Sequence, residues 1–140
     1  MDVKSAFFNG FLEEEVYIEQ PMRYEVNEHE DKVLKLNKAL HGLKQAPRAW
    51  YSRIDDYFLK NEFIKCPHEY VIYVKIKKND DILIVCLYVH GLIFIGNNPK
   101  MFEDFKQAMI KEFEMTNIGL ISHYLGIEIK QGEDRIFMNQ

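Results

Sequence analysis

Apolar and polar residues alternate with the period of a β-strand in several short stretches of this 140-residue chain. Residues 16–18, in an acidic frame, and residues 33–36, which alternate apolar with basic side chains, predict two strands that pair with each other. The polar and acidic residues 21–31 between them predict a loop. Asn9-Gly10 upstream is a turn signal.

The middle of the chain predicts two consecutive hairpins. Residues 70–76 and 82–89 are rich in β-branched and aromatic side chains, with a polar turn between them. Residues 92–95 form a third apolar run, which makes the second hairpin very tight, with His90-Gly91 at its tip. Glycine accepts positive φ, so this dipeptide suits a tight turn.

Two further stretches predict amphipathic helices. The first, residues 47–61, has Pro47 in its first turn and apolar side chains at helical spacing: Trp50, Ile54, Tyr57 and Phe58. The second, residues 99–113, has one apolar face, made of Met101, Phe102, Phe105, Met109, Ile110 and Phe113. Strands at 123–130 and 135–138 complete the chain. The order predicts an α+β fold with the helices packed on one antiparallel sheet.

The composition is that of one globular domain. Hydrophobic residues make up 47% and charged residues 29%, and 10 Phe and 8 Tyr supply a core, so a disordered, collagen-like or coiled-coil chain is excluded. Two cysteines do not form a disulfide scaffold, and Cys66, His68 and Cys86 match no zinc spacing. The start is no signal peptide, and the longest apolar run, residues 82–89, is too short to span a bilayer. We therefore expect an intracellular protein without a membrane partner.

Charge is distributed unevenly along the chain. Residues 1–31 carry nine acidic and two basic side chains, residues 32–78 carry four acidic and eleven basic ones, and residues 79–140 carry nine and five. The net charges are therefore −7, +7 and −4. Overall acidity argues against a simple basic nucleic-acid-binding domain, but the basic middle allows local contacts with phosphates. The adjacent acids Glu13–Glu15 predict a solvated loop.

Four long blocks of the sequence resemble successive blocks of one protein family, in that family's order and spacing. They read MDVKSAFFNGFLEEEVYIEQP, KALHGLKQAPRAWY, LYVHGLIFIGN and FEMTNIGLISHYLGIEI. The family is that of the copia-type retrotransposon reverse transcriptases, and the resemblance covers essentially the whole chain. It implies a polymerase palm that extends a primer on RNA, with a primer–template and deoxynucleotide triphosphates as partners.

The resemblance also implies a metal site. Polymerase palms place carboxylates at the end of one strand and at the tip of a neighbouring hairpin, where they hold two Mg²⁺ ions. Such ions prefer oxygen ligands and sit between carboxylates and substrate phosphates. They activate the primer 3′-hydroxyl and stabilise the leaving pyrophosphate.

Matched position by position, the resemblance implies these roles. Asp2 is similar to the first catalytic, metal-binding carboxylate, and Phe7 to the aromatic residue under the sugar of the incoming nucleotide. The nucleotide- and template-binding segment spans residues 41–48 and includes Gly42, Lys44, Gln45 and Arg48. His41 stands where the family usually has Tyr. The primer-binding segment contains Tyr124, Leu125 and Gly126.

The chain departs from the family at the hairpin tip. The family motif is Tyr-Val-Asp-Asp, and this chain has Tyr88-Val89-His90-Gly91. A histidine nitrogen suits zinc or copper better than magnesium, and glycine has no side chain. Asp80 and Asp81 lie at the other end of the strand, about eight residues of ~3.3 Å from the tip. We therefore expect no productive Mg²⁺ binding and no polymerase activity.

Several alternatives remain. The chain could be a residual primer–template-binding module, or a remnant of a retroelement without function. Asp2 could be a flexible terminal acid, and Lys44, Gln45 and Arg48 could be solvated residues at a helix start. The resemblance implies that residues 1–140 are a single partial domain, without the N-terminal part of the fingers, the thumb and the ribonuclease H domain.

Overall fold

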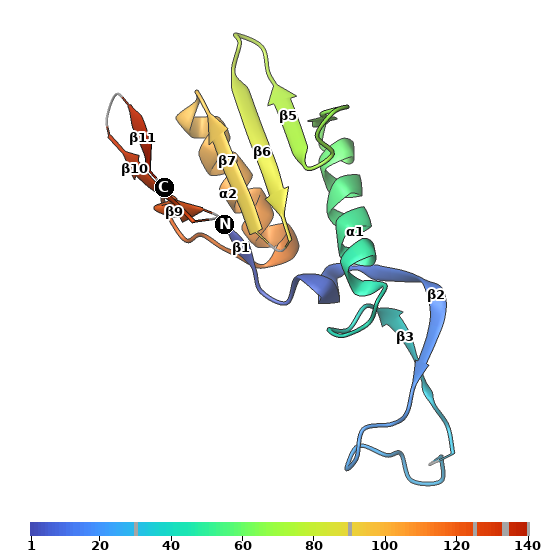
Figure 1. The fold of residues 1–140 in the computed structure, drawn as a ribbon. Coiled ribbons are helices and arrows are strands. Elements are labelled where there is room, and N and C mark those ends of the chain that lie inside the picture. The colour runs from blue at the N-terminus through green and yellow to red at the C-terminus, as the bar shows by residue number, and fades with distance from the viewer. Residues whose placement is uncertain (30, 90, 125, 133–134, 140) are drawn as a thin grey trace. The chain divides into compact units, whose positions relative to one another are not determined.

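The computed structural model describes residues 1–29, 31–89, 91–124, 126–132 and 135–139. The chain divides into two compact units. The larger unit contains Met1–Lys4 and Lys65–Gln140, and the smaller contains Ser5–Ile64. The fold is a mixture of helices and antiparallel strand pairs (Figure 1), as the sequence predicts.

The larger unit is organised around a central sheet with the order β4-β5-β6-β7-β1-β8. Its strands are β4 (Ile64–Lys65), β5 (Ile72–Ile76), β6 (Ile82–Tyr88), β7 (Gly91–Gly96), β1 (Asp2–Val3) and β8 (Met115–Thr116). The predicted hairpins are confirmed, since β5 pairs with β6 and β6 with β7, both antiparallel. The N-terminal β1 lies between β7 and β8.

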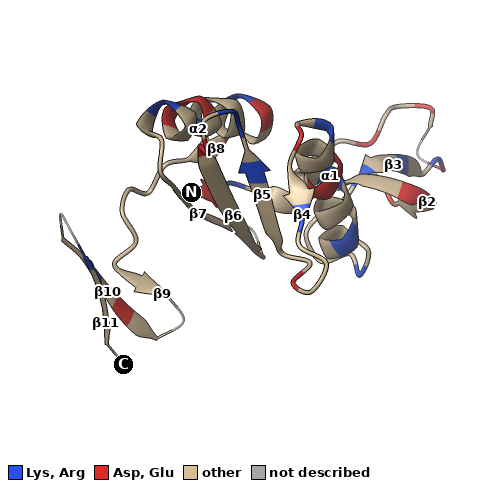
Figure 2. Ribbon diagram, turned by 90° about the horizontal axis from the view of Figure 1, so that it is seen from above, with Lys and Arg blue, Asp and Glu red and all other residues tan. Residues whose placement is uncertain are grey.

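Helix α2 (Pro99–Phe113) covers one face of this sheet (Figure 1), and its bounds match the predicted ones. Burial alternates along β6, with Leu83, Val85 and Leu87 buried toward the core. From the helix, the buried side chains are Met101, Phe105, Met109 and Phe113. Figure 2 shows β6 without charged residues along its length, whereas both basic and acidic residues occur along α2.

Two asparagines tie the start of α2 to the turn between β5 and β6. The Asn98 side-chain oxygen accepts hydrogen bonds from the Lys100 and Met101 amides at 2.9 and 3.1 Å, which caps the helix. Its amide donates to Asp81 Oδ2 at 2.8 Å. The Asn97 side chain accepts from the Ile82 amide at 2.8 Å. Asp81 therefore has a structural role at the end of β6 far from the β6–β7 turn.

The β6–β7 turn differs in detail from the sequence prediction. Tyr88 pairs with Gly91, so Gly91 is the first residue of β7 and not a residue of the turn. Gly91 does not have positive φ; Val89 does, with φ 45°. His90 lies outside the described residues. A β-branched residue in the left-handed region is strained, so the conformation of Val89 costs free energy in this turn.

A second sheet of the larger unit contains β9 (His123–Tyr124), β10 (Ile127–Gln131) and β11 (Ile136–Asn139), in the order β11-β10-β9. The predicted strand over residues 123–130 is therefore interrupted, and Gly126 has φ 82° at the break. Leu125 lies outside the described residues. The prediction of one antiparallel sheet is wrong, because the strands form three separate sheets.

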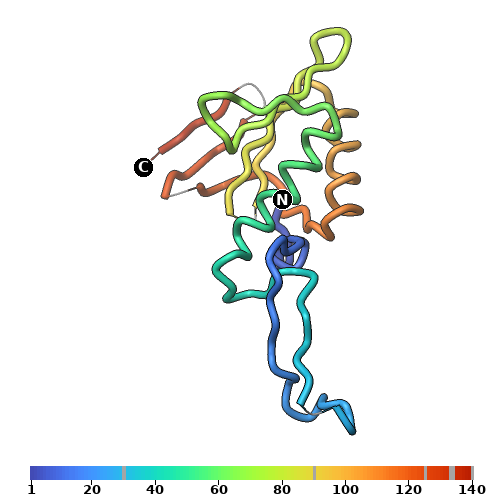
Figure 3. The backbone as a smooth tube through the Cα atoms, turned by 90° about the vertical axis from the view of Figure 1, so that its right-hand side faces the viewer, coloured from blue at the N-terminus to red at the C-terminus, as the bar shows by residue number. Residues whose placement is uncertain are grey.

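The smaller unit contains η1 (Ala6–Asn9), β2 (Phe11–Ile18), β3 (Leu34–Lys38) and α1 (Ala46–Lys60). The predicted pairing of residues 16–18 with residues 33–36 is confirmed. The helix predicted over residues 47–61 is confirmed too, and it begins one residue earlier than expected. Figure 3 follows β2 and β3 side by side to the loop that joins them. Glu13, Glu14 and Glu15 lie within β2 and not in a loop, where the β2–β3 register shifts.

Gly10 allows η1 and β2 to approach α1 closely. Its φ is −78°, which any residue adopts, so the turn predicted at Asn9-Gly10 does not need glycine. A Cβ at this position would lie 2.6 Å from both the Ala49 carbonyl carbon and the Trp50 nitrogen. Real Cβ atoms are not found so close to backbone. Gly10 is therefore required by packing against the helix that carries Trp50, which is buried.

We expect Gly10→Ala to lower the free energy of unfolding by about 1–3 kcal/mol, because the helix must move to admit the methyl group. Urea denaturation followed by the fluorescence of Trp50, the one tryptophan in the chain, measures this. Gly132→Ala is the matched control, since among the described residues its Cβ would meet the Arg135 carbonyl oxygen at 3.4 Å, an ordinary contact distance. Equal midpoints for the two variants would contradict the close approach.

We expect Val89→Gly to raise the free energy of unfolding by about 1 kcal/mol. Glycine removes the steric cost of the left-handed conformation, and little packing is lost because Val89 is 56% exposed. Thermal unfolding compares it with Ile95→Gly, a similarly exposed residue in β7, which should be destabilising. A loss of stability in both variants would show that the turn is not strained.

Candidate functional site

Asp2 lies beside Gly91 in the central sheet. The two residues are partners in the antiparallel β1–β7 pair. One step further, Met1 and Leu92 exchange backbone hydrogen bonds: the Met1 amino group donates to the Leu92 carbonyl, and the Leu92 amide to the Met1 carbonyl, both at 2.8 Å. A Cβ at Gly91 would lie 4.0 Å from Asp2 Oδ1. A carboxylate on residue 91 would therefore stand next to that of Asp2.

The donor atoms at this place do not suit a pair of magnesium ions. Gly91 has no side chain, and His90 lies outside the described residues. Across the part of the chain that the structure describes, no three His, Cys, Asp or Glu side chains lie close enough together to hold a metal ion. Asp2 thus provides one carboxylate where a two-metal site needs several oxygen ligands.

Tyr88 and Tyr124 bring the predicted primer segment to the same hairpin. Their ring centroids are 5.8 Å apart and their planes meet at 75°, an edge-to-face contact. Burial raises the pKa of the Tyr124 phenol above its ordinary value, and the nearby Cys86 and Tyr88 raise it further. Gly126, in the same segment, has φ 82° and open space where a Cβ would be.

Cys86 lies two residues before Tyr88, on the same face of β6. Burial, and secondarily the charge of Glu69, raises the pKa of the Cys86 thiol. The Cys66 amide donates to the Ile72 carbonyl, and Ile72 is opposite Cys86, so one strand separates the two cysteines. Two strand spacings of about 4.8 Å exceed the reach of a disulfide. Both thiols are free.

In the smaller unit, Phe7 contacts His41. The ring centroids are 5.5 Å apart, with the planes tilted by 35°. His41, which stands where the family usually has Tyr, is therefore an aromatic neighbour of Phe7. Gly42 follows with φ 96°, a conformation that favours glycine, in the turn that leads to α1. Lys44 lies two residues further on, before the start of α1, and is exposed.

Gln45 and Arg48 line a shallow hollow between the start of α1 and β2. The other lining residues are Phe11, Glu13, Glu14, Ala49 and Ser52. Sequence reasoning missed the two glutamates, which it assigned to a loop. If the strand predicted at residues 16–18 had been extended toward the N-terminus, Glu13 and Glu14 would have been placed on it. The predicted template-binding cation Arg48 therefore has acidic neighbours, which weaken its attraction for phosphate.

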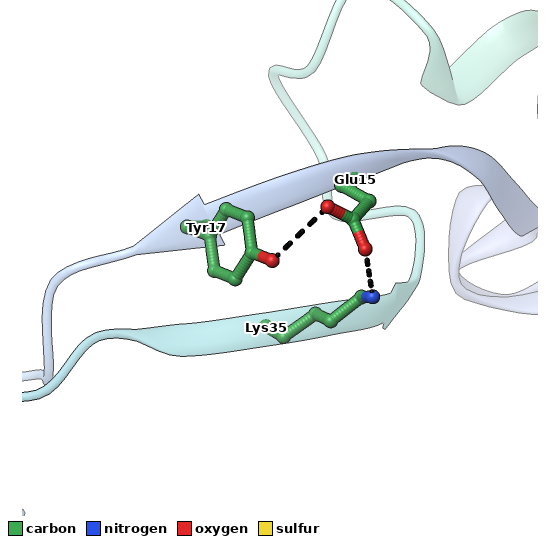
Figure 4. A network of polar contacts seen from close by, with 3 residues as sticks. All are labelled: Glu15, Tyr17 and Lys35. Carbon is green, nitrogen blue, oxygen red and sulfur yellow. Dashed lines mark hydrogen bonds and ion pairs between the residues drawn. The ribbon is translucent and has the colours of Figure 1, made fainter.

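The third glutamate of the run has a different role. Glu15 forms an ion pair with Lys35 on β3 and accepts a hydrogen bond from the Tyr17 hydroxyl at 3.2 Å (Figure 4). Both charged side chains are at least half exposed, so the pair contributes at most about 1 kcal/mol. This network supports the β2–β3 pairing and leaves Glu13 and Glu14 for the hollow.

The predicted site residues divide between the two units. Asp2, Gly91, Tyr124 and Gly126 lie in the larger one, where backbone pairing and one ring contact connect the first three. The nucleotide- and template-binding candidates lie in the smaller one: Phe7, Gly42, Lys44, Gln45 and Arg48. His90 and Leu125 lie outside the described residues.

Comparison with known proteins shows which family the chain resembles over its whole length. The family model described as reverse transcriptase (RNA-dependent DNA polymerase) matches residues 1–140. The chain is 37% identical over 129 residues to the retrovirus-related Pol polyprotein from transposon TNT 1-94 of Nicotiana tabacum, covering 92% of this chain and 10% of the relative. It is 31% identical over 140 residues to the corresponding polyprotein from transposon RE1 of Arabidopsis thaliana, covering 100% and 10%.

A yeast relative is shorter. The transposon Ty5-1 protein of Saccharomyces cerevisiae is 30% identical over 134 residues, which are 96% of this chain and 43% of that protein. The chain spans about a tenth of the length of the plant relatives. No solved structure matches. Among the described residues, no helix is long and apolar enough to cross a membrane. The chain belongs to the reverse transcriptase family, among its copia-type retrotransposon members.

Proposed function

We propose that this chain is the palm region of a copia-type RNA-directed DNA polymerase and that it does not itself catalyse nucleotidyl transfer. The observation that carries the proposal is the pairing of Asp2 with Gly91, which is where the resemblance puts two metal-binding carboxylates. The family motif requires an acid at position 91, and a Cβ there would lie 4.0 Å from the Asp2 carboxylate. The backbone of the site is retained and the ligands are lost.

The remaining roles follow from the resemblance. Asp2 is the vestigial first carboxylate, and His90 and Gly91 occupy the positions of the lost ones. Phe7, supported by His41, lies under the sugar of the nucleotide. The template and nucleotide contacts come from Gly42, Lys44, Gln45 and Arg48. Tyr124, Leu125 and Gly126 bind the primer. Residues 1–140 then form one partial domain of a cytoplasmic or nuclear polymerase.

A second candidate function is retained binding of a primer–template duplex. It is favoured by Lys38, which is exposed on β3 and lies 5.4 Å from the centre of the Phe11 ring. Lysine that neutralises phosphate releases counterions, so such binding weakens steeply with salt. Titration of a labelled RNA–DNA duplex at two salt concentrations tests it. Affinity that does not change with salt would contradict this function.

We expect the chain to show no templated primer extension with Mg²⁺ or Mn²⁺. The missing ligands supply several kcal/mol of transition-state stabilisation in a two-metal site, and each 1.4 kcal/mol lost is a tenfold loss of rate. The measurement is extension of a labelled primer on an RNA template, with the tobacco relative's polymerase as the positive control. Extension above background that depends on the template would overturn the proposed inactivity.

We expect the double variant His90→Asp, Gly91→Asp to gain affinity for Mn²⁺ at least tenfold, because the new carboxylate at position 91 then stands beside Asp2. Isothermal titration calorimetry measures the affinity. The matched control adds Asp2→Asn to the double variant, which should reverse the gain while the two new acids remain. A gain that survives Asp2→Asn would place the new acids away from Asp2.

The same double variant should be less stable than the parent without metal, by about 1 kcal/mol. Adjacent aspartates facing Asp2 repel one another, which raises carboxylate pKa values. Divalent cations bind only the folded site and should restore part of the loss. Melting curves with and without millimolar Mg²⁺ compare the proteins. Equal stability in all four conditions would contradict the assignment of this hairpin.

A further inference from the structure

The β2–β3 ribbon of the smaller unit has two faces of opposite character. Residues that are opposite each other in a strand pair share a face, and so do residues two positions apart in one strand. Tyr17 and its partner Lys35 therefore lie on one face, where Glu15 contacts both side chains (Figure 4). The register places four aliphatic side chains on the other, aliphatic face: Val16, Ile18, Leu34 and Leu36.

Helix α1 lies beside the start of the ribbon. It packs where Gly10 approaches Ala49 and where Phe11 lines the hollow. Beyond that point β2 and β3 extend past the helix (Figures 1 and 3). Leu34, at the far end of the aliphatic face, is 43% exposed. Because a two-stranded ribbon is marginally stable until its apolar face packs on another layer, this face needs a partner that α1 does not supply.

The two ends of the ribbon carry opposite charges. At the end near Gly10, Lys38 lies on the same face as Leu36, over the ring of its partner Phe11, which is 57% exposed. At the other end, the loop of residues 19–32 carries five acidic and two basic side chains. The aliphatic face thus extends from a lysine at one end to an acidic loop at the other.

Hydrogen bonds from Gln20 tie the acidic loop together. The Gln20 side-chain amide donates to the carbonyl oxygens of His29 and Lys32, at 2.6 and 2.8 Å. Two apolar side chains of the loop, Met22 and Tyr24, are 86% and 80% exposed. A loop that is already ordered loses less conformational entropy when it docks, which favours its use as a contact surface.

We propose that the same face of a second copy of this chain covers the aliphatic face, with the two ribbons pointing in opposite directions, in a two-fold symmetric dimer. The aliphatic side chains of the two copies then pack on one another, as the inner faces of two stacked sheets do. By symmetry, the acidic loop of each copy lies over Phe11 and Lys38 of the other, so opposite charges meet twice. A parallel arrangement would instead bring the two acidic loops together, which like-charge repulsion opposes. This contact is independent of the function proposed above.

Sedimentation equilibrium of the 140-residue chain tests the dimer. The average mass should rise from that of one copy toward that of two as the chain concentration increases. Leu34→Asp puts a charge on the aliphatic face and should weaken dimerisation by about tenfold or more. Asn37→Asp, exposed on the opposite face of β3, is the matched control and should leave dimerisation unchanged. The mass of one copy at every concentration overturns the proposal, and is the result expected if another protein or another segment of a longer polyprotein covers this face.

A charge exchange tests the orientation of the two copies. Lys38→Glu in one variant, and Glu25→Lys with Glu28→Lys in another, place like charges where the loop meets residue 38, and each should weaken dimerisation by about tenfold or more. Equal amounts of the two variants should dimerise as the parent does, because every loop then faces an opposite charge. Lys100→Glu, exposed on α2, makes the same change in net charge and should leave the parent affinity unchanged.

Each outcome of the charge exchange decides one part of the proposal. Single variants that dimerise like the parent overturn the antiparallel orientation, since two parallel copies would have like charges at both ends with or without these changes. A mixture that stays monomeric overturns the contact between the acidic loop and Lys38.

Discussion

The strict alternation of side chains along β6 is the constraint on which the larger unit depends. Leu83, Val85 and Leu87 must face α2, because a shift of one residue would turn all three to solvent. This fixes the register with β7, and hence the pairing of Tyr88 with Gly91. Since β7 also pairs with β1, the same apolar residues set where Asp2 lies.

The same constraint explains why the hairpin keeps its place although residue 91 has no side chain. Pairing closes the turn through backbone groups at residues 88 and 91, and those groups are present whatever side chain residue 91 carries. The sequence favours glycine as the turn residue because of its conformational freedom. Packing of β6 and β7 instead places Gly91 in the strand and transfers the left-handed conformation to Val89. Strain is tolerated there because the paired strands on both sides hold the turn.

Local and non-local features differ in how far they could be predicted from the sequence. The helix Pro99–Phe113 was predicted to the residue, because helical spacing and a capping Asn98 are both encoded within a few positions. The close approach of Gly10 to Ala49 and the contact of Phe7 with His41 join residues more than thirty positions apart in sequence. Hydrophobic periodicity is a local signal, so it does not predict contacts between residues so far apart. The break at Gly126 was missed because apolar residues continue on both sides of it.

Charge placement shows the same difference in the smaller unit. A run of three glutamates predicts solvation, but the shifted β2–β3 register assigns its members to different surroundings. Glu15 pairs with Lys35, and Glu13 and Glu14 line the hollow with Arg48. Two acids next to one guanidinium leave a local charge that opposes a phosphate backbone, in a segment whose net charge is positive. Lys38, by contrast, lies outside the hollow on the neighbouring strand, 5.4 Å from the centre of the Phe11 ring. The net charge of a stretch of sequence is therefore a poor guide to the charge of the surface it forms, because pairing across strands decides which of its cations have an acidic partner.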